Sequence, residues 1–540
     1  MRRPWAIALL VFVVGCADRT PEPELELGPP ASSAGVVSFL HLNDTYRIDA
    51  VEDGTRGGFG RVTTVIRELQ RQGHAVHLLH GGDFLYPSLE SQLWDGQQMI
   101  DAFNFMHALA PLTVVPGNHE FDRRTPDTLI DALEASNFSW LAANIDLTTG
   151  RSDIDARIGR HDILESEGKK FGVFSLTLHP DGGGNVRDYM RFEPNYIDVA
   201  RRQIEELEAQ GVDLIIGLTH LHLEDDLEVA GLRADYPRFV LIAGGHEHEP
   251  EHARSSADRA EVVKGASNAR TIWQVDFEFD QDEGGGYVMT SKRIELDDSV
   301  AEDPEYQILA DRWRGRLLET IPFLPSRVGE AAVPFDAREV TIRNEESNWG
   351  NFVADQMRIA FGEPAADLAF INSGTLRIDD YIAGDITFED IARTFGFSSF
   401  LRYLDMSGAE FRETLEAGFR GEGPSKGYFP QVSGFRICVD RRQAEGGRIV
   451  QLQVPAAEGG FTEIEDGKDY RVVAPDFLLR GGDGYQFPET RERSLPGSEL
   501  KYRVLDAVVR AQAEGEKVGA PVDPDNPRIA FVAEGESRCF

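Results

Sequence analysis

Cysteine is scarce in this chain, with three residues among 540. So few cysteines exclude the cross-linked framework of a disulfide-rich secreted domain. Cys438 and Cys539 are able to pair in an oxidising compartment, but the sequence alone leaves that pairing open. Basic residues are also few, with 55 Lys and Arg against 92 Asp and Glu and a net charge of −37. Because a polyanionic chain repels nucleic acid, the sequence predicts no nucleic-acid polymer as a partner.

Long apolar runs are lacking outside the N-terminus, where Arg2 and Arg3 precede an apolar stretch at residues 5–15. This stretch is too short for a spanning helix and is typical of an export signal. Its ending, V-V-G-C, resembles a bacterial lipoprotein signal, in which Cys16 becomes the lipidated first residue of the mature chain. The alternative is an ordinary cleaved signal. Both predict export to the periplasm or cell envelope, with membrane contact only through the anchor.

The segment at 17–35 is rich in Pro, Glu and Ser, which predicts a disordered tether. The remaining length predicts two or more domains. Residues 36–300 alternate apolar strands with helices, the pattern of an α/β sheet with parallel neighbours, and end in an antiparallel hairpin near 270–298. Residues 301–326 are predicted to form a linker helix that serves as a hinge. Residues 327–535 form a second α/β unit with a helix near 348–361.

Polar residues follow the expected strands of the first unit where each strand ends. Ligands of open α/β sheets bind at the carboxyl ends of strands. Asx and His residues there also make ordinary turns, and at a single strand end that reading is as good. Their recurrence at five strand ends instead favours a metal site, since carboxylate and imidazole ligands suit Mn²⁺, Zn²⁺ and Fe. The residues are Asp44, Asp83, Asn118, His119, Glu120, Asp122, His220, His246 and His248.

The second unit carries its own polar strand end. The strand near 367–371 runs into a loop from Asn372 to Arg377. Arg377 is able to offer a two-pronged donor to a phosphate, or to lie solvated on a surface turn. Asp483 stands in G-G-D-G-Y, where the glycines expose the backbone and bring the carboxylate forward.

These motifs resemble a known family. The first unit is similar to calcineurin-like metallophosphoesterases in five motifs: N-D-x-x, G-G-D, G-N-H-E-F-D, T-H and G-G-H-x-H. Among these, G-N-H-E-F-D resembles the 5′-nucleotidase and UDP-sugar hydrolase branch of that family. The second unit resembles the 5′-nucleotidase C-terminal domain in four motifs: W-G-N-F-V-A-D, N-S-G-x-x-R, Q-V-S-G and F-L-x-x-G-G-D-G-Y. The resemblance covers about residues 36–535. It implies an N-terminal four-layer α-β-β-α sandwich followed by a second α/β domain that binds substrate.

The resemblance also implies roles for individual residues. Two divalent cations, Mn, Zn or similar, would share Asp83. The first would be held with Asp44 and His248, and the second with Asn118, His220 and His246. His119 would stabilise the transition state or protonate the leaving group, with Asp122 orienting it. In the second domain, Phe429 and Phe477 would sandwich a nucleobase, Asp483 would take the ribose hydroxyls, Asn372 would bond near the base, and Arg377 would meet the phosphate.

The chain departs from the family pattern at three places. Tyr46 stands where the first motif usually has a ligating His. Three arrangements are open: Tyr46 lies outside the ligand set while water fills the position, which we favour; it ligates as a phenolate; or the first metal binds weakly. Thr375 replaces a usual Gly, and Asp476 a usual Asn. Of the additional arginines common in the family, only Arg358 is found near the expected helix.

The sequence therefore predicts an exported dinuclear phosphohydrolase that removes phosphate from nucleotides through a metal-activated water. The alternatives within the enzyme class are a UDP-sugar diphosphatase, a 2′,3′-cyclic nucleotide phosphodiesterase, or a hydrolase of another anion such as a thiosulfate ester. A further alternative is a nucleotide-binding protein with reduced catalysis, to which Tyr46 would point.

Overall fold

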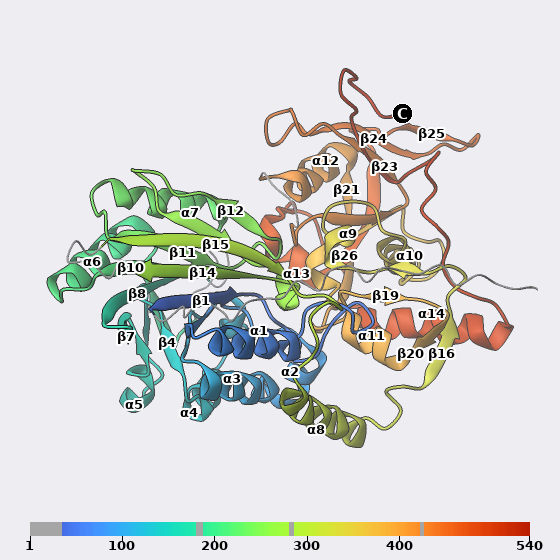
Figure 1. Cartoon of the computed structure of the whole chain (residues 1–540). Helices are drawn as coiled ribbons and strands as arrows, with labels where there is room; N and C mark the ends of the chain where they lie inside the picture. Colours follow the sequence, from blue (N-terminus) through green and yellow to red (C-terminus); the bar gives the residue numbers. More distant parts are fainter. Residues whose placement is uncertain (1–34, 180–186, 280–285, 422–425) are drawn as a thin grey trace, which may run out of the picture.

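The computed structural model of the chain describes residues 35–179, 187–279, 286–421 and 426–540. The predicted signal, with Cys16, and residues 17–34 of the tether lie outside these ranges. Figure 1 shows two domains side by side, the first coloured blue to green and the second yellow to red. Each domain has its own sheets and its own cores. The two-domain α/β organisation predicted from the sequence is confirmed.

The first domain contains two stacked sheets. The larger sheet has the order β15 (Tyr287–Glu295), β14 (Thr271–Phe279), β1 (Val36–Leu42), β2 (Ala75–His80), β3 (Leu112–Val114), β4 (Ser139–Leu141) and β6 (Ile158–Gly159). The other has the order β12 (Glu251–Ala253), β13 (Glu261–Lys264), β11 (Phe239–Gly244), β10 (Leu214–His220), β8 (Lys169–Thr177) and β7 (His161–Ser166). Strands β1 to β4 pair in parallel, as do β8, β10, β11 and β13. β5 (Ile145–Leu147) and β9 (Met190–Phe192) form a small separate ladder.

The strands are apolar on both faces because both faces are covered. Successive side chains of a strand point to opposite sides. In β1, Val37 and Phe39 join the core between the two sheets, whereas Leu40 and Leu42 join the core under the helices. The larger sheet is covered by α1 (Phe59–Arg71), α3 (Gln97–Leu109), α4 (Asp127–Ala135) and α8 (Pro304–Thr320). The other is covered by α6 (Tyr196–Ala209) and α7 (Leu223–Ala230). The result is the predicted four-layer α-β-β-α sandwich. The short helices α2 (Leu89–Trp94) and α5 (Ser152–Asp155) lie in connections.

The second domain is built on the sheet β21 (Leu401–Ser407), β26 (Asp469–Pro475), β18 (Leu368–Asn372) and β22 (Pro430–Ser433). One face packs on α10 (Asn348–Arg358), α11 (Phe388–Thr394) and α14 (Leu500–Glu514). The other packs on α12 (Gly408–Glu416) and on a second sheet of β25 (Phe461–Glu463), β24 (Ile449–Pro455), β23 (Arg436–Val439) and β27 (Ile529–Phe531). β16 (Arg327–Glu330) pairs with β20 (Asp385–Thr387), and β17 (Phe335–Asp336) with β19 (Tyr381–Ile382). The short helices are α9 (Glu339–Ile342) and α13 (Asp476–Leu479).

Helix α8 begins directly after the first domain. Asp303 caps its N-terminus by accepting from the backbone N–H groups of Glu305 and Tyr306. Tyr306 is fully buried, and its hydroxyl donates to the Ile48 carbonyl at 2.8 Å. The helical part of the predicted linker therefore packs against the first domain, and residues 321–326 connect it to β16.

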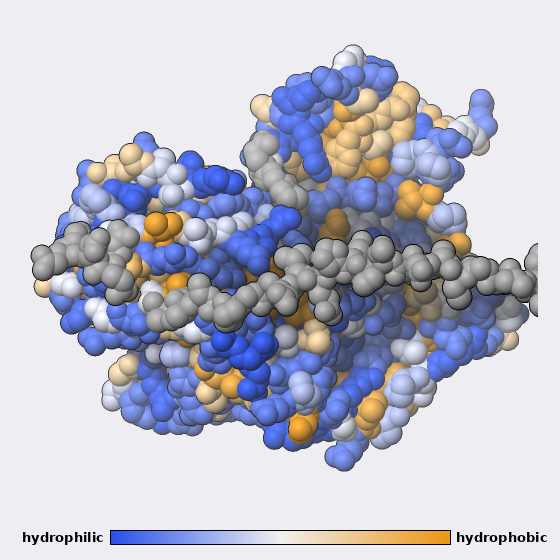
Figure 2. Space-filling model, viewed as in Figure 1, coloured by the Kyte–Doolittle hydropathy of each residue, from blue (hydrophilic) through white to orange (hydrophobic). Residues whose placement is uncertain are grey.

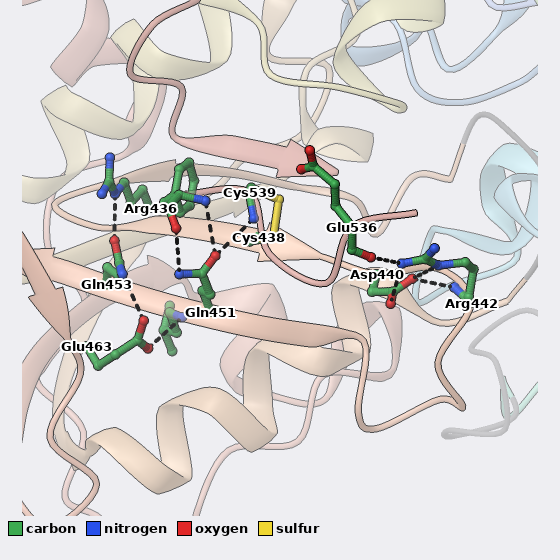
Figure 3. The surroundings of a disulfide bond; sticks show 11 residues. Arg436, Cys438, Asp440, Arg442, Gln451, Gln453, Glu463, Glu536 and Cys539 are labelled. Atoms are coloured by element: carbon green, nitrogen blue, oxygen red, sulfur yellow. Dashed lines mark hydrogen bonds and ion pairs between the residues drawn. A yellow bond between two sulfur atoms is a disulfide. The ribbon is translucent and has the colours of Figure 1, made fainter. Parts of the chain in front are cut away.

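A disulfide fastens the end of the chain. Cys438 in β23 is bonded to Cys539, 101 residues later. Figure 3 shows Gln451 of the neighbouring strand beside this bridge, where its side-chain oxygen accepts from the backbone N–H of Cys539 and of Phe540 at 3.0 and 3.1 Å. The pairing that the sequence left open is present, and it holds the last residues against the second sheet.

The surface agrees with the acidic composition. Figure 2 shows hydrophilic residues over most of the visible face of both domains. Among the described residues, no helix has both the length and the apolar character needed to cross a membrane.

Candidate metal centre and substrate site

The carboxyl ends of strands from both sandwich sheets meet at one place. Asp44 follows β1, Asp83 follows β2, and His220 is the last residue of β10. One ligand atom from each of these three buried residues lies within 4.8 Å of the others. The polar strand ends that the sequence presented as one series thus come from two different sheets, and stacking the sheets brings them to a common point.

The remaining predicted ligands surround this trio. Asn118 Oδ1 lies 3.2 Å from His220 Nε2, and His248 Nε2 lies 3.2 Å from Asp44 Oδ1. The backbone N–H of His246 donates to Asp44 Oδ2 at 2.8 Å, and the rings of His246 and His220 stand 5.3 Å apart. All the residues predicted to ligate metal therefore lie together.

The local backbone is shaped around these side chains. Asp44, Asp83, His246 and His248 all have positive φ, at 51°, 59°, 89° and 65°. Non-glycine residues rarely adopt this conformation, and such strain gathers at functional sites. The space is equally constrained, since a Cβ on Gly117 would lie 2.1 Å from Asp83 Oδ1. Only glycine at this position lets the Asp83 carboxylate stand where it does.

The charges show that the residues fit divalent cations. Burial alone would lower the pKa of His220, but Asp83 and Asp44 raise it to about 10. Burial would likewise raise the pKa of Asp44, yet His248, His220 and Asn43 hold it well below its usual range. The pKa of Asp83 is lowered as well, chiefly by His220 and His119 against the effect of burial, so the centre places two ionised carboxylates in a buried site that favours positive charge. With its nitrogen and amide-oxygen donors, this set matches what borderline divalent metals prefer.

Glu120 is a residue of this centre to which the sequence gave no role. It is buried, and its carboxylate accepts from the backbone N–H groups of Asp83, Phe84, Leu85 and Gly117 at 2.5 to 2.9 Å. It thereby ties the loop after β2 to the loop after β3. Its place in the G-N-H-E-F-D motif was the available signal.

His119 lies at the edge of the centre. Its Nδ1 is 2.9 Å from Asp122 Oδ2, and its backbone N–H donates to Asp83 Oδ1 at 2.9 Å. Burial opposes a charged ring, but Asp122 and Asp83 outweigh it and raise the pKa of His119. The Nε2 atom faces Arg377 of the second domain, whose Nη2 is 3.2 Å away. An imidazole with a raised pKa and an arginine from the other domain therefore lie in contact at this position.

Tyr46 occupies the place of the usual ligating His. Its hydroxyl oxygen lies 3.0 Å from His248 Nε2, 3.4 Å from Asp44 Oδ1 and 3.5 Å from Asp83 Oδ2. Burial, followed by the charges of Asp83 and Asp44, raises the pKa of Tyr46 well above 10. A neutral phenol is a poor ligand, which favours the arrangement with Tyr46 outside the ligand set.

A second arginine faces the site and was missed from the sequence. Arg343, one residue beyond α9, is buried, and its Nη2 donates to Glu339 at 2.7 Å. Nε of Arg343 and Nη1 of Arg377 are two of several buried donors in the described residues that have no hydrogen-bond acceptor. Such donors are costly unless an anion takes them up. Arg358, the arginine noted from the sequence, instead bonds Ser433 and Ala366 at the other end of β22.

The predicted nucleoside residues divide into a polar pair and two aromatic rings. Asn372 Nδ2 donates to Asp483 Oδ2 at 2.8 Å, so these two residues lie together. Phe477 is 42% exposed and packs beside Gly482. Phe429 is only 3% exposed, with its ring 5.7 Å from Phe419. Phe477 is therefore the open ring, whereas Phe429 is largely taken up by the core.

Comparison with known proteins identifies the family. Residues 37–250 match the calcineurin-like phosphoesterase model, and residues 327–490 match the model of the 5′-nucleotidase C-terminal domain. The chain belongs to the calcineurin-like phosphoesterases that carry a 5′-nucleotidase C-terminal domain. It is accordingly a metal-dependent phosphoric ester hydrolase, and the buried Asp44, Asp83 and His220 group is able to hold a divalent metal.

Individual members of this phosphoesterase family resemble most of the chain. Bovine 5′-nucleotidase is 26% identical over 87% of this chain and 88% of its own length. The trifunctional nucleotide phosphoesterase YfkN of Bacillus subtilis is 27% identical over 85% of this chain, which spans only 32% of that longer protein. The 5′-nucleotidase precursor of Thermus thermophilus has the same fold, with a TM-score of 0.78 at 23% identity over 92% of this chain and 100% of that one.

Proposed function

We propose that this phosphoesterase is a 5′-nucleotidase that uses two divalent cations to remove phosphate from nucleotides. The observation that carries the proposal is the contact between Arg377 and His119. An arginine with an unused buried donor, from the domain that would bind the nucleoside, lies 3.2 Å from an imidazole beside the metal centre. A phosphate bound beside this pair would be held by one domain and attacked in the other.

The ligand assignment follows from the positions of the donors. Asp44 and His248 would hold one cation and Asn118, His220 and His246 the other, with Asp83 shared because its carboxylate lies close to both Asp44 and His220. When bound, the cations supply Lewis acidity and neutralise the charge that develops on the phosphoryl oxygens. The chain's own task is to hold the donors in place, which Glu120 and the glycine-lined loops do.

His119 acts as proton donor or electrostatic stabiliser in this proposal. Asp122 fixes the ring through Nδ1, which leaves Nε2 to face the substrate. The raised pKa of His119 keeps a proton available near neutral pH, as a general acid requires. Arg377 and Arg343 would pair with the phosphate through their unused donors.

The nucleoside would lie on the second domain. Asp483 and Asn372, bonded to each other, are positioned to take hydroxyl groups and a base edge. Phe477 offers an open ring on which a flat base of any kind is able to stack, whereas the buried ring of Phe429 leaves little surface for a base.

We further propose export and a lipid anchor at Cys16. The Cys438–Cys539 bridge supports export, since such bonds persist in oxidising compartments. Mass spectrometry of protein from a bacterial membrane fraction tests the anchor: wild type should carry diacylglycerol on Cys16, and Cys16→Ser should be released into the soluble fraction. An unmodified, soluble wild-type protein would refute the anchor.

The function is tested by hydrolysis of AMP, ATP, UDP-glucose and a 2′,3′-cyclic nucleotide, with free phosphate, glucose 1-phosphate and the ring-opened nucleotide measured as the respective products. Mn²⁺, Zn²⁺ or Ca²⁺ is added back after chelation, and Asp83→Asn and His119→Asn serve as controls. Metal-dependent release from AMP that is lost in both variants supports a 5′-nucleotidase. Preference for UDP-glucose or the cyclic nucleotide would replace it with the corresponding diphosphatase or phosphodiesterase. Nucleotide binding without formation of any of these products would refute hydrolysis and identify a binding protein.

A further inference from the structure

Glu339 is a buried carboxylate of the second domain that reaches into the first. It is the first residue of α9 and is 1% exposed. Its backbone N–H donates to Asp379, which also accepts from Asn268 and Arg270 of the first domain. The residue is thus held at the contact between the two domains.

The two oxygens of Glu339 face different partners. Oε2 is 2.7 Å from His248 Nδ1 and accepts from Ser267 Oγ at 2.8 Å, and both partners belong to the first domain. Oε1 accepts from Arg343 Nη2 at 2.7 Å and lies 4.0 Å from Arg377 Nη1. One carboxylate therefore connects a metal ligand to both arginines that face the phosphate position.

The contact with His248 decides which nitrogen of that ring is available. A carboxylate at Nδ1 keeps the proton there, because an ionised acid accepts and does not donate. Arg343 Nη2, which donates to Oε1 at 2.7 Å, supplies the counter-charge for this buried carboxylate. Nε2 of His248, which points to Asp44, is then the unprotonated nitrogen. Carboxylates in this position orient a ligating His and raise its basicity.

We propose that Glu339 is a positioning residue for the metal ligand His248, so that the metal centre is complete only while the second domain contacts the first. The proposal rests on the proposed function in one respect, the assignment of His248 as a ligand. It adds that a residue outside the metallophosphoesterase domain sets metal affinity.

Linkage between the sites follows from this arrangement. If the domain contact brings Glu339 to His248, metal binding favours the form with the domains in contact. A nucleotide that favours the same form then tightens metal binding, and metal tightens nucleotide binding by the same factor. The arginines on Oε1 make the link direct, since an anion on Arg343 or Arg377 helps hold the carboxylate in place.

The test measures metal affinity without turnover. Apoprotein of the full chain is titrated with Mn²⁺ and with Zn²⁺ against a chromophoric chelator, with and without a non-hydrolysable nucleotide analogue. We expect Glu339→Gln to bind the weaker cation about 10- to 100-fold less tightly, the range for outer-shell carboxylates, and to lose the tightening by nucleotide. Glu339→Asp, which keeps the charge but shortens the side chain, should fall between.

The matched control is Glu90→Gln. Glu90 of α2 receives both terminal nitrogens of Arg393 across the same domain boundary, at 2.7 and 3.2 Å, but contacts no predicted ligand. The metal affinity of Glu90→Gln should stay within about threefold of wild type, a smaller change than the loss expected for an outer-shell carboxylate. Wild-type affinity in Glu339→Gln would overturn the proposal, as would an equal loss in Glu90→Gln. If Glu339→Gln does not fold, Glu339→Asp decides by the same criterion.

The readout separates this proposal from the proposed function. A wild-type protein that binds metal but releases phosphate from no nucleotide would overturn the nucleotidase assignment. The metal affinities of Glu339→Gln and wild type would still decide the role of Glu339. Conversely, an active nucleotidase whose metal affinity is unchanged by Glu339→Gln would overturn the role of Glu339 alone.

Discussion

Lys264 offers the sharpest test of how the metal-binding loop is supported. It is the last residue of β13, has no exposed surface, and its ammonium lies 2.8 Å from Asp226 of α7 and 2.5 Å from Glu247. It also donates to the carbonyls of Leu221 and Gly245 at 2.7 and 3.0 Å. Burial alone would lower the pKa of Lys264, but Asp226 and Glu247 raise it above its usual value. Glu247 sits between His246 and His248 in the chain, so the lysine anchors the loop that carries both.

Replacing Lys264 by Met keeps most of the volume and removes the charge. Two buried carboxylates then lack their cation, and breaking a buried pair in this way costs about 3–5 kcal/mol. That corresponds to roughly two to four orders of magnitude in the folding equilibrium of the first domain. Part of this free energy is recovered in the triple variant Lys264→Met, Asp226→Asn, Glu247→Gln, which has no buried charge at this position.

The assay is urea unfolding of the metal-free protein, with hydrogen exchange of peptides from β11 and β13 to assign the transition to the first domain. Assignment is needed because a two-domain chain need not unfold in one step. Lys264→Met should shift the unfolding transition of the first domain to lower urea concentration and leave the transition of the second domain unchanged. A loss below about 1 kcal/mol, the size of an exposed pair, would refute the reasoning, as would a triple variant no more stable than the single one.

Three further predictions concern the substrate and metal positions. Arg343→Ala should lower kcat/KM for AMP about 10- to 150-fold, the value of one or two charge-assisted hydrogen bonds, whereas Arg358→Ala should leave it unchanged; equal effects would contradict the assignment. Tyr46→Phe should keep the wild-type metal content, whereas Tyr46→His should tighten metal binding about tenfold or more, as measured by chelator competition. Metal loss in Tyr46→Phe would instead identify a phenolate ligand. Phe477→Ala should lower kcat/KM about 5- to 150-fold at unchanged melting temperature, while Phe429→Ala should cost roughly 3–5 kcal/mol of stability by leaving a cavity; the reverse pattern would make Phe429 the accessible ring.

Part of this site was predictable because its signals are local. Asp44 and Asp83 lie within three residues of the end of an apolar strand and His220 is the last residue of one, so chain order alone puts them at the carboxyl ends of strands. The four-layer fold was predicted from family motifs, since strand and helix alternation indicates parallel sheets without showing that two of them stack.

Other residues were not predictable because their roles arise through space. Glu339 meets His248 across 91 positions of sequence, and no periodicity links them. Arg343 lies just after a helix of one turn, where a solvated surface arginine looks the same in sequence. For Phe429, the motif placed the residue but not its exposure, which depends on Phe419 and Phe531 packing on its ring.

The bridge between Cys438 and Cys539 has a practical consequence for making the protein. The predicted metal ligands are carboxylates, imidazoles and an amide, so none of them is changed by a reducing compartment. Chain produced in a reducing cytoplasm would keep that chemistry but lose the clamp on its last residues, and with it the loop-closure entropy, on the order of 4–5 kcal/mol for a loop of 101 residues. Material prepared in that way would have full specific activity when fresh and a shortened shelf life, a difference that reoxidation should reverse.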